Sequence, residues 1–299
     1  GALANEETAK NPPANIYPMT HISEILEWCN REGQTFWEYV EECEGPGIWD
    51  YLDEIWTAMC ETIVRGLTAE GVLPGGLKVS RKASTYLVKA ESYTDSLRSR
   101  AKLYAYALAT AEENASGGTV VTAPTCGSSA VMPAVLYHLV NTRNFSRLRI
   151  LRALATGGLF GNVAKTNSSI SGAEVGCQGE VGVACAMAAA AACQLFGGTP
   201  SQIEYAAEIA MEHHLGLTCD PICGLVQIPC IERNAVAAKR AIDSANLAHM
   251  LVGTRTISFD MVVRTMYETG VSMNRAFRET SEGGLAKLYS RRAGQTLGK

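Results

Sequence analysis

The spacing of apolar residues predicts that most of this chain is helical. Apolar side chains recur at three- and four-residue steps through residues 21–69, as on the buried face of a helix. The sequence Gly45-Pro46-Gly47 interrupts this repeat, so we expect a second helix from Trp49 to Gly66. Alternating strand patterns are scarce, and we predict a mainly α-helical fold whose glycine-rich loops hold the site. Further helices are predicted over residues 97–112, 130–141, 146–161, 183–196, 200–215 and 232–251.

Two of the predicted helices have clear start signals. Thr199 is suited to cap the helix that begins at Pro200, and Gln202 would complete a capping box. Ser258 is expected to cap a helix further along the chain. Residues 1–20 are polar and rich in proline, so we interpret them as a linker or tail.

Composition and charge are those of an ordinary globular protein. Hydrophobic residues make up 47% and charged residues 19% of the 299 positions, which allows a large core without disulfides. The net charge of −4 argues against nucleic acid as a partner, because phosphate binding needs clustered Lys and Arg. The longest apolar run, Val181–Cys193, is too short to span a bilayer, and Gly1–Pro18 lacks the features of a secretory signal. We therefore expect a cytoplasmic protein with no membrane partner.

The ten cysteines are concentrated in the middle of the chain, where seven lie between positions 126 and 230. In a reducing compartment this favours metal or redox chemistry over disulfides. Polar segments at 165–180, 213–221 and 229–234 each place a cysteine near a predicted helix end. Helix ends carry unpaired N–H and C=O groups, which suit charged ligands and clusters.

Cys177, Cys219 and Cys230 are the cysteines of these three segments. Their spacing does not match the tight pairs of zinc fingers or ribbons. A four-iron cluster held by three cysteines would leave one iron open to act as a Lewis acid. The same residues are also compatible with small buried thiols that pack as apolar side chains. The residues alone leave both interpretations open.

Long motifs along the chain resemble the α domain of iron–sulfur-dependent L-serine dehydratases. The resemblance is collinear over residues 21–286, which we take as one catalytic domain, followed by a C-terminal tail at 287–299. The motifs are VVTAPT (Val120–Thr125), EGVLPGGLKVSRKA (Glu70–Ala83), SISGAEVGCQGEVGVAC (Ser169–Cys185), GLTCDPICGLVQIPCIERNA (Gly216–Ala235) and RETSEGGLA (Arg278–Ala286).

The resemblance implies an ammonia-lyase that converts L-serine into pyruvate and ammonia. It implies a 4Fe-4S cluster bound by Cys177, Cys219 and Cys230, with the substrate at the fourth iron, and no pyridoxal phosphate (PLP). A β domain or β chain, whose own motif is absent from these residues, would complete the enzyme, and a homo-oligomer is expected. The alternatives are a non-catalytic iron–sulfur or redox-sensing subunit, or a related dehydratase for another small hydroxy amino acid.

Polar residues within and near these motifs are the candidates for the reaction itself. Their alternative roles are local turn bonds, structural ion pairs and packing. Glu174 and Glu180 are both candidates for the general base or for a group that orients it, and Lys165 and Arg233 are candidates for holding the carboxylate. The catalytic candidates are Lys165, Asn167, Ser169, Ser171, Glu174 and His214. The substrate-binding candidates are Thr125, Cys126, Gly127, Gln178, Arg233 and Asn234.

Cys126 departs from the family pattern, because relatives usually carry asparagine at this position of TAPTCG. A thiol here could alter specificity, be oxidised, or act as an extra ligand.

Overall fold

The computed structural model describes residues 16–250, 253 and 255–297, and these are mainly helical, as predicted. In place of strands, the described residues contain two isolated bridges, Val72 with Ser80 and Cys219 with Arg278. None of the helices in this part of the chain is long and apolar enough to cross a membrane. The longer elements are α2 (Ile22–Glu32), α3 (Phe36–Glu44), α4 (Ile48–Thr68), α5 (Ala83–Ala90), α6 (Asp95–Ala115), α7 (Val131–Arg143), α8 (Arg147–Asn167), α10 (Val183–Leu195), α11 (Pro200–Glu212), α12 (Cys230–Met250), α13 (Phe259–Ser272) and α14 (Gly284–Leu297).

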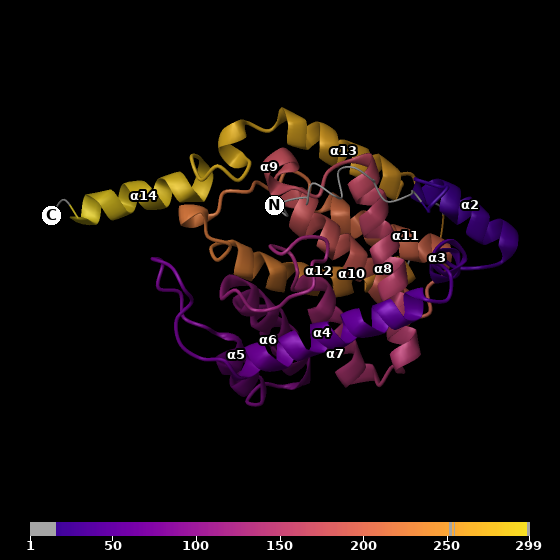
Figure 1. The fold of residues 1–299 in the computed structure, drawn as a ribbon, viewed down its shortest axis with the longest axis horizontal. Coiled ribbons are helices and arrows are strands. Elements are labelled where there is room, and N and C mark those ends of the chain that lie inside the picture. The colour runs from indigo at the N-terminus through magenta and orange to yellow at the C-terminus, as the bar shows by residue number, and fades with distance from the viewer. Residues whose placement is uncertain (1–15, 251–252, 254, 298–299) are drawn as a thin grey trace.

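The alanine-rich helix α10 forms the centre of the core. It packs against α7, α8, α11 and α12, which gather around it in Figure 1. All but one of its residues are buried. Small side chains let the neighbouring backbones approach closely: a Cβ built on Gly157 of α8 would lie 2.8 Å from the carbonyl oxygen of Met187. The alanine run therefore serves helix packing.

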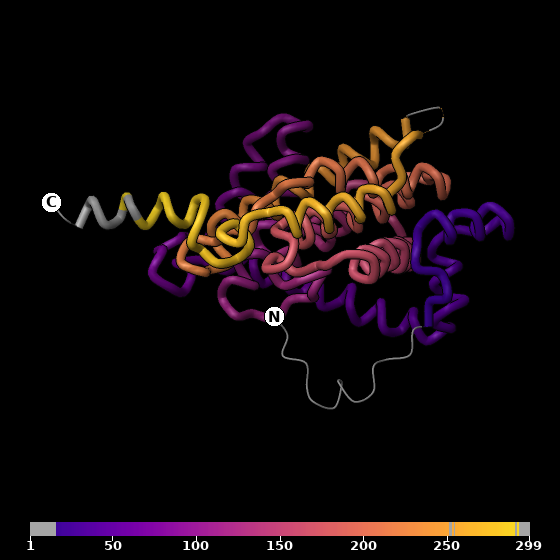
Figure 2. The backbone as a smooth tube through the Cα atoms, turned by 90° about the horizontal axis from the view of Figure 1, so that it is seen from above, coloured from indigo at the N-terminus to yellow at the C-terminus, as the bar shows by residue number. Residues whose placement is uncertain are grey.

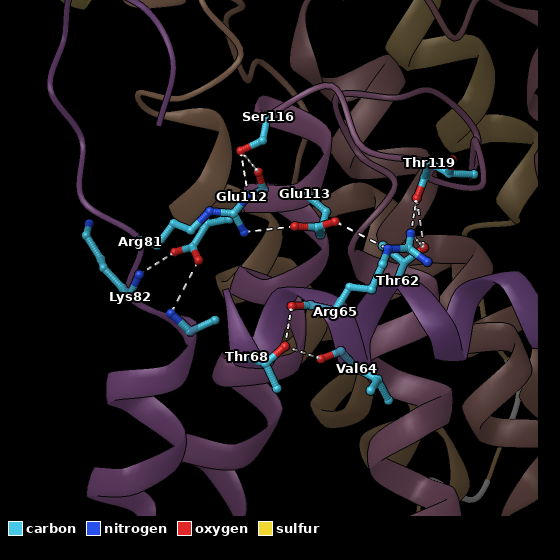
Figure 3. Close-up of polar contacts among 11 residues, drawn as sticks. Thr62, Val64, Arg65, Thr68, Arg81, Lys82, Glu112, Glu113, Ser116 and Thr119 are labelled. Carbon is cyan, nitrogen blue, oxygen red and sulfur yellow. Dashed lines mark hydrogen bonds and ion pairs between the residues drawn. The ribbon is translucent and has the colours of Figure 1, made fainter. Parts of the chain in front are cut away.

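A buried carboxylate pair on α6 fixes the segment that leads into α5 (Figure 3). Arg81 Nη1 donates to Glu113 Oε1 at 2.9 Å, and the backbone N–H of Lys82 donates to Glu112 Oε1 at 2.7 Å. Arg65 of α4 reaches the other oxygen of Glu113 at 3.5 Å. Burial raises the pKa of Glu112 above its usual range. The pair thus joins α4, α6 and the segment before α5.

The C-terminal helix α14 projects away from the rest of the molecule (Figures 1 and 2). It begins at Gly284, so the domain boundary expected at residue 286 falls inside a helix. Of the polar tail expected at residues 1–20, only 16–20 belong to the described part, and Leu251, the expected end of α12, also lies outside it.

The two predicted helix caps are confirmed. Thr199 and Gln202 form a capping box on α11, and the side chain of Ser258 accepts from the Met261 N–H at the start of α13. Two other predictions were wrong in detail, and one helix was missed. The segment expected as a loop from residue 165 begins on α8, which continues to Asn167, and Cys230 is already the first residue of α12. Helix α5 was not predicted.

Candidate functional site

The three cysteine-bearing segments meet at one cavity of about 440 Å³. Its walls come from loops far apart in the sequence, and in the described chain they include no Lys, Arg or His. Four cysteines and two glutamates contribute to the lining. The lining residues are Thr122, Pro124, Thr125, Cys126, Gly127, Ile170, Ser171, Gly172, Cys177, Glu180, Val181, Cys219, Pro221, Val226, Cys230 and Glu279.

Cys177, Glu180 and Cys219 form the most compact part of the site. One ligand atom from each lies within 4.8 Å of the other two. The thiols of Cys177 and Cys219 each approach Glu180 Oε2 at 3.8 Å. Thr125 Oγ1 donates to the other oxygen, Oε1, at 3.0 Å. The carboxyl group of Glu180 is therefore held between a hydroxyl and two thiols.

The position of Cys177 follows from the buried side chain of the next residue, Gln178. Its Nε2 donates to the carbonyl oxygens of Val175 at 2.8 Å and Met266 at 3.1 Å, and its Oε1 accepts the Gly216 N–H at 3.0 Å. Gln178 also starts the π-helical turn η1 (Gln178–Gly182), which carries Glu180. Since its amide is fully used by backbone groups, Gln178 fixes the loop rather than facing the cavity.

Cys219 and Cys230 are held by different neighbours. The N–H of Cys219 donates to the Phe277 carbonyl oxygen at 2.8 Å, which ties the loop after α11 to the segment after α13. Cys230 is fixed by its place in the first turn of α12. A hydrogen bond with the Cys177 thiol, together with burial, raises the pKa of Cys219 above its usual range. Burial raises the pKa of Cys230 to about 12.

Asn234 of α12 holds the loop that bears Thr125, Cys126 and Gly127. Its Nδ2 donates to the Gly127 carbonyl oxygen at 2.8 Å, and its Oδ1 accepts the Ala130 N–H at 3.2 Å. The side chain is buried, and a third bond at 2.8 Å joins it to the Cys230 carbonyl oxygen. Asn234 therefore connects the Cys126 loop to Cys230 from behind the cavity.

Two glycines make room for the carboxyl group of Glu180. A Cβ on Gly172 would lie 2.6 Å from Glu180 Oε2 and 2.9 Å from Cys219 Sγ. A Cβ on Gly127 would lie 3.4 Å from Glu180 Oε1. A side chain at Gly172 would push the acidic group and the thiol out of place, whereas a Cβ at Gly127 would make only an ordinary contact with the carboxyl group. Burial raises the pKa of Glu180, and the nearby Glu279 adds to this.

Several catalytic candidates lie outside the cavity lining. The exposed Glu174 bonds to Ser169 and borders a different surface depression. Asn167 donates to the carbonyl oxygen of Thr20 at 2.6 Å and so ties the end of α8 to the N-terminal segment. Lys165, on the same last turn, lines an adjoining pocket of about 350 Å³ that shares Thr122, Pro124 and Ile170 with the cavity. Their catalytic roles remain predictions.

His214 and Arg233 also have structural partners. His214 is buried with Nδ1 2.7 Å from the Ala210 carbonyl oxygen, and burial lowers its pKa to about 4. Arg233 Nη1 donates to the Thr218 carbonyl oxygen at 2.6 Å and lies 3.7 Å from Asp220. Arg233 thereby steadies the loop that presents Cys219. Of the catalytic candidates, Ser171 lines the cavity.

Glu180 and Glu279 both line the cavity; Glu180 was a candidate for the general base but not one of the catalytic set chosen from the sequence, and Glu279 was not a candidate. Glu180 was weighed beside Glu174, and its spacing from Cys177 would have favoured it, because residues three apart share one face of a helical turn. Glu279 lies in RETSEGGLA, but nothing in that motif shows that the segment after α13 folds back onto Cys219. Cys223, on the 3₁₀ turn after Cys219, is exposed and lies outside the cavity lining.

Known proteins are similar in sequence to most of this chain. Residues 8–286 match the family profile described as serine dehydratase alpha chain. The chain is 45% identical over 300 residues to L-serine dehydratase 1 of Escherichia coli strain K12, which covers 96% of this chain and 66% of that relative. It is 48% identical over 277 residues to the L-serine dehydratase of Streptomyces coelicolor, with 90% and 61% covered. For L-serine dehydratase TdcG of Escherichia coli the identity is 52% over 237 residues, with 78% and 52% covered. The chain thus spans about two thirds or less of these relatives' length.

Proposed function

This chain belongs to the serine dehydratase alpha chain family, and we propose that it is the cluster-binding part of an enzyme that converts L-serine into pyruvate and ammonia. The observation that carries the proposal is the meeting of Cys177, Cys219 and Cys230 at one cavity. They come from three separate segments and are not neighbours in the sequence. Simple packing of apolar thiols does not require three of them to line a cavity that also holds an acidic group.

The donor set fits a 4Fe-4S cluster. All three cysteines are buried, and none is in a disulfide within the described residues. Thiolate sulfur is the ligand that such clusters use, and three sulfur ligands leave one iron without a protein ligand. Gly172, where a Cβ would meet Cys219 Sγ, keeps the space beside the sulfur open. Cys177, Cys219 and Cys230 would hold the cluster, which would supply Lewis-acid activation of the substrate hydroxyl.

The chain's own residues would bind and orient the substrate. The carboxyl groups of Glu180 and Glu279 line the cavity and suit the ammonium group of L-serine. The hydroxyl of Thr125 fixes Glu180, and Ser171 offers a further polar contact. Apolar side chains, among them Val181 and Val226, complete the wall and limit the access of water.

The relatives are longer than this chain, so the active enzyme is proposed to contain a β part as well. The lining provides acidic groups but no Lys, Arg or His from the described residues. A cation for the substrate carboxylate is therefore expected from the bound cluster or from the β part.

Anaerobic reconstitution of the whole chain with iron and sulfide tests this proposal. We expect four irons and four sulfides per chain and the absorption of a 4Fe-4S cluster, and we expect pyruvate from L-serine when a β part is supplied. Single serine substitutions of Cys177, Cys219 and Cys230 should each abolish stable cluster binding. The exposed Cys223 provides the matched control, because Cys223→Ser should leave the cluster intact.

Each failure has a distinct meaning. A cluster that forms without pyruvate, even with a β part, would support a redox-sensing subunit or a different hydroxy amino acid as substrate. The absence of a cluster in the unaltered chain would refute the cluster site.

A further inference from the structure

We propose that Cys177, Glu180 and Cys219 form a site for a single thiophilic divalent cation, such as Zn²⁺ or Co²⁺, which does not require Cys230. The proposal shares two cysteines with the proposed cluster, but it does not depend on serine dehydratase activity. It rests on the geometry of three side chains whose ligand atoms lie within 4.8 Å of one another.

The distances are those of ligands that share one ion. Metal–sulfur and metal–oxygen bonds of about 2.3 and 2.1 Å at a tetrahedral angle place sulfur and oxygen about 3.6 Å apart. Both thiols lie 3.8 Å from Glu180 Oε2, so a small movement of the side chains would suffice. Sulfur atoms that bind different irons of one cluster must stand further apart than ligands of a single ion. The compact group can therefore hold one cation with little movement, whereas a cluster would require the two thiols to separate.

The surroundings hold this ligand set in place. Thr125 Oγ1 donates to Glu180 Oε1 at 3.0 Å, which leaves Oε2 directed to the thiols. Gly172 provides the space that Oε2 and Cys219 Sγ occupy, since a Cβ there would approach them to 2.6 and 2.9 Å. Groups that hydrogen-bond to a metal-binding side chain orient that side chain, and their loss commonly weakens metal affinity by about 10- to 100-fold. Thr125 has this role for Glu180.

Cys230 lines the same cavity but lies outside the compact group. This asymmetry separates the two kinds of metal binding. A single ion would use Cys177, Glu180 and Cys219 with a fourth position open to the cavity, whereas a cluster would need the third thiol. A site with sulfur and oxygen ligands binds Zn²⁺ more strongly than Fe²⁺. The two forms of the site would therefore compete for the same two thiols.

Co²⁺ titration of the metal-free whole chain under anaerobic conditions provides the test. Tetrahedral Co²⁺ with thiolate ligands gives sulfur-to-metal charge-transfer and strong d–d absorption bands. We expect one Co²⁺ per chain, displaced by one Zn²⁺. Cys177→Ser and Cys219→Ser should each weaken binding and reduce the charge-transfer band per bound Co²⁺ by about half, and Glu180→Gln should weaken binding by at least about tenfold.

Two variants make the outcome specific. Cys230→Ser should keep the Co²⁺ site while losing the cluster, and Glu174→Gln, an exposed acidic residue of the same segment, should bind Co²⁺ like the unaltered chain. Circular dichroism would establish that each variant is folded. Equal loss of Co²⁺ binding in Cys230→Ser, or unchanged affinity in Glu180→Gln, would overturn the proposal. Cluster assembly in Glu180→Gln would show that the cluster of the proposed function does not depend on the single-cation site.

Discussion

Replacing Asn234 with alanine should destabilise the protein, because its amide joins α12 to the loop of Thr125, Cys126 and Gly127. Two of its hydrogen bonds cross between these elements: Nδ2 to the Gly127 carbonyl at 2.8 Å, and the Ala130 N–H to Oδ1 at 3.2 Å. The side chain is 1% exposed, so water cannot replace the lost partners without entering the core.

The magnitude follows from what is left unpaired. Each lost hydrogen bond removes about 0.5–1.5 kcal/mol of net stability, and a buried donor without a partner costs about 1–3 kcal/mol. The N–H of Ala130 would be such a donor. Gly127 is only half-buried, so the loss of the bond to its carbonyl oxygen should cost less stability. We expect the free energy of unfolding to fall by about 2–4 kcal/mol.

Urea unfolding followed by circular dichroism measures this change, with Asn141→Ala as the matched control. The Nδ2 of Asn141 also donates to the carbonyl four residues earlier, that of Tyr137, at 2.7 Å, but the residue is exposed on α7. Its substitution should change stability by less than about 0.5 kcal/mol. Equal stability of the two variants would refute the anchoring role. A rise in KM without loss of stability would instead restore the substrate-binding role predicted from the sequence.

Three further predictions follow from packing, charge and burial. Gly158→Ala should raise the free energy of unfolding by about 0.5–1 kcal/mol, because no atom lies within 4 Å of the new Cβ. In urea unfolding, Gly157→Ala should be about 1–3 kcal/mol less stable than Gly158→Ala, because its Cβ would meet the Met187 carbonyl. Equal stability of the two variants would contradict the close packing of α8 on α10. Arg81→Ala should cost about 1–3 kcal/mol, because the buried Glu113 would keep only its longer contact with Arg65, and Glu113→Gln in the same background should recover part of this in thermal unfolding. Burial lowers the pKa of His138 to about 4, so the unfolded chain takes up a proton first as the pH falls below about 6.5. The free energy of unfolding should therefore have its full value above that pH and be lower by about 2 kcal/mol near pH 5. In urea titrations at several pH values, His138→Gln should reduce this dependence of stability on pH.

Local signals explain why so much of the fold could be predicted. The capping box of Thr199 and Gln202 and the cap at Ser258 depend on residues within one helical turn, and both were found where the sequence placed them. Apolar periodicity located the long helices for the same reason. Helix α5 was missed because it is short and follows an extended segment whose anchors, Glu112 and Glu113, come from another helix.

The candidate site was less accessible to sequence reasoning because it is made by long-range contacts. Nothing local indicates that Cys219 pairs with Arg278, or that Thr125 reaches Glu180. The motif residues Gln178 and Asn234 were selected as substrate-binding candidates, yet their amides bind buried backbone groups. A polar residue in a glycine-rich motif has two possible tasks, binding a ligand or holding the loop, and only the fold separates them.

The charges around the cavity indicate how the work of the proposed enzyme is divided. L-serine carries an ammonium and a carboxylate, and the described lining offers Glu180 and Glu279 to the first but no cationic side chain to the second. Lys165 and Arg233, the two cations expected to hold the carboxylate, face an adjoining pocket and the Thr218 carbonyl. Removing either cation should therefore leave KM for serine little changed, whereas removing a cluster cysteine should abolish turnover. The carboxylate must be neutralised by something that enters the cavity after this chain has folded, whether the bound metal or a residue of the β part.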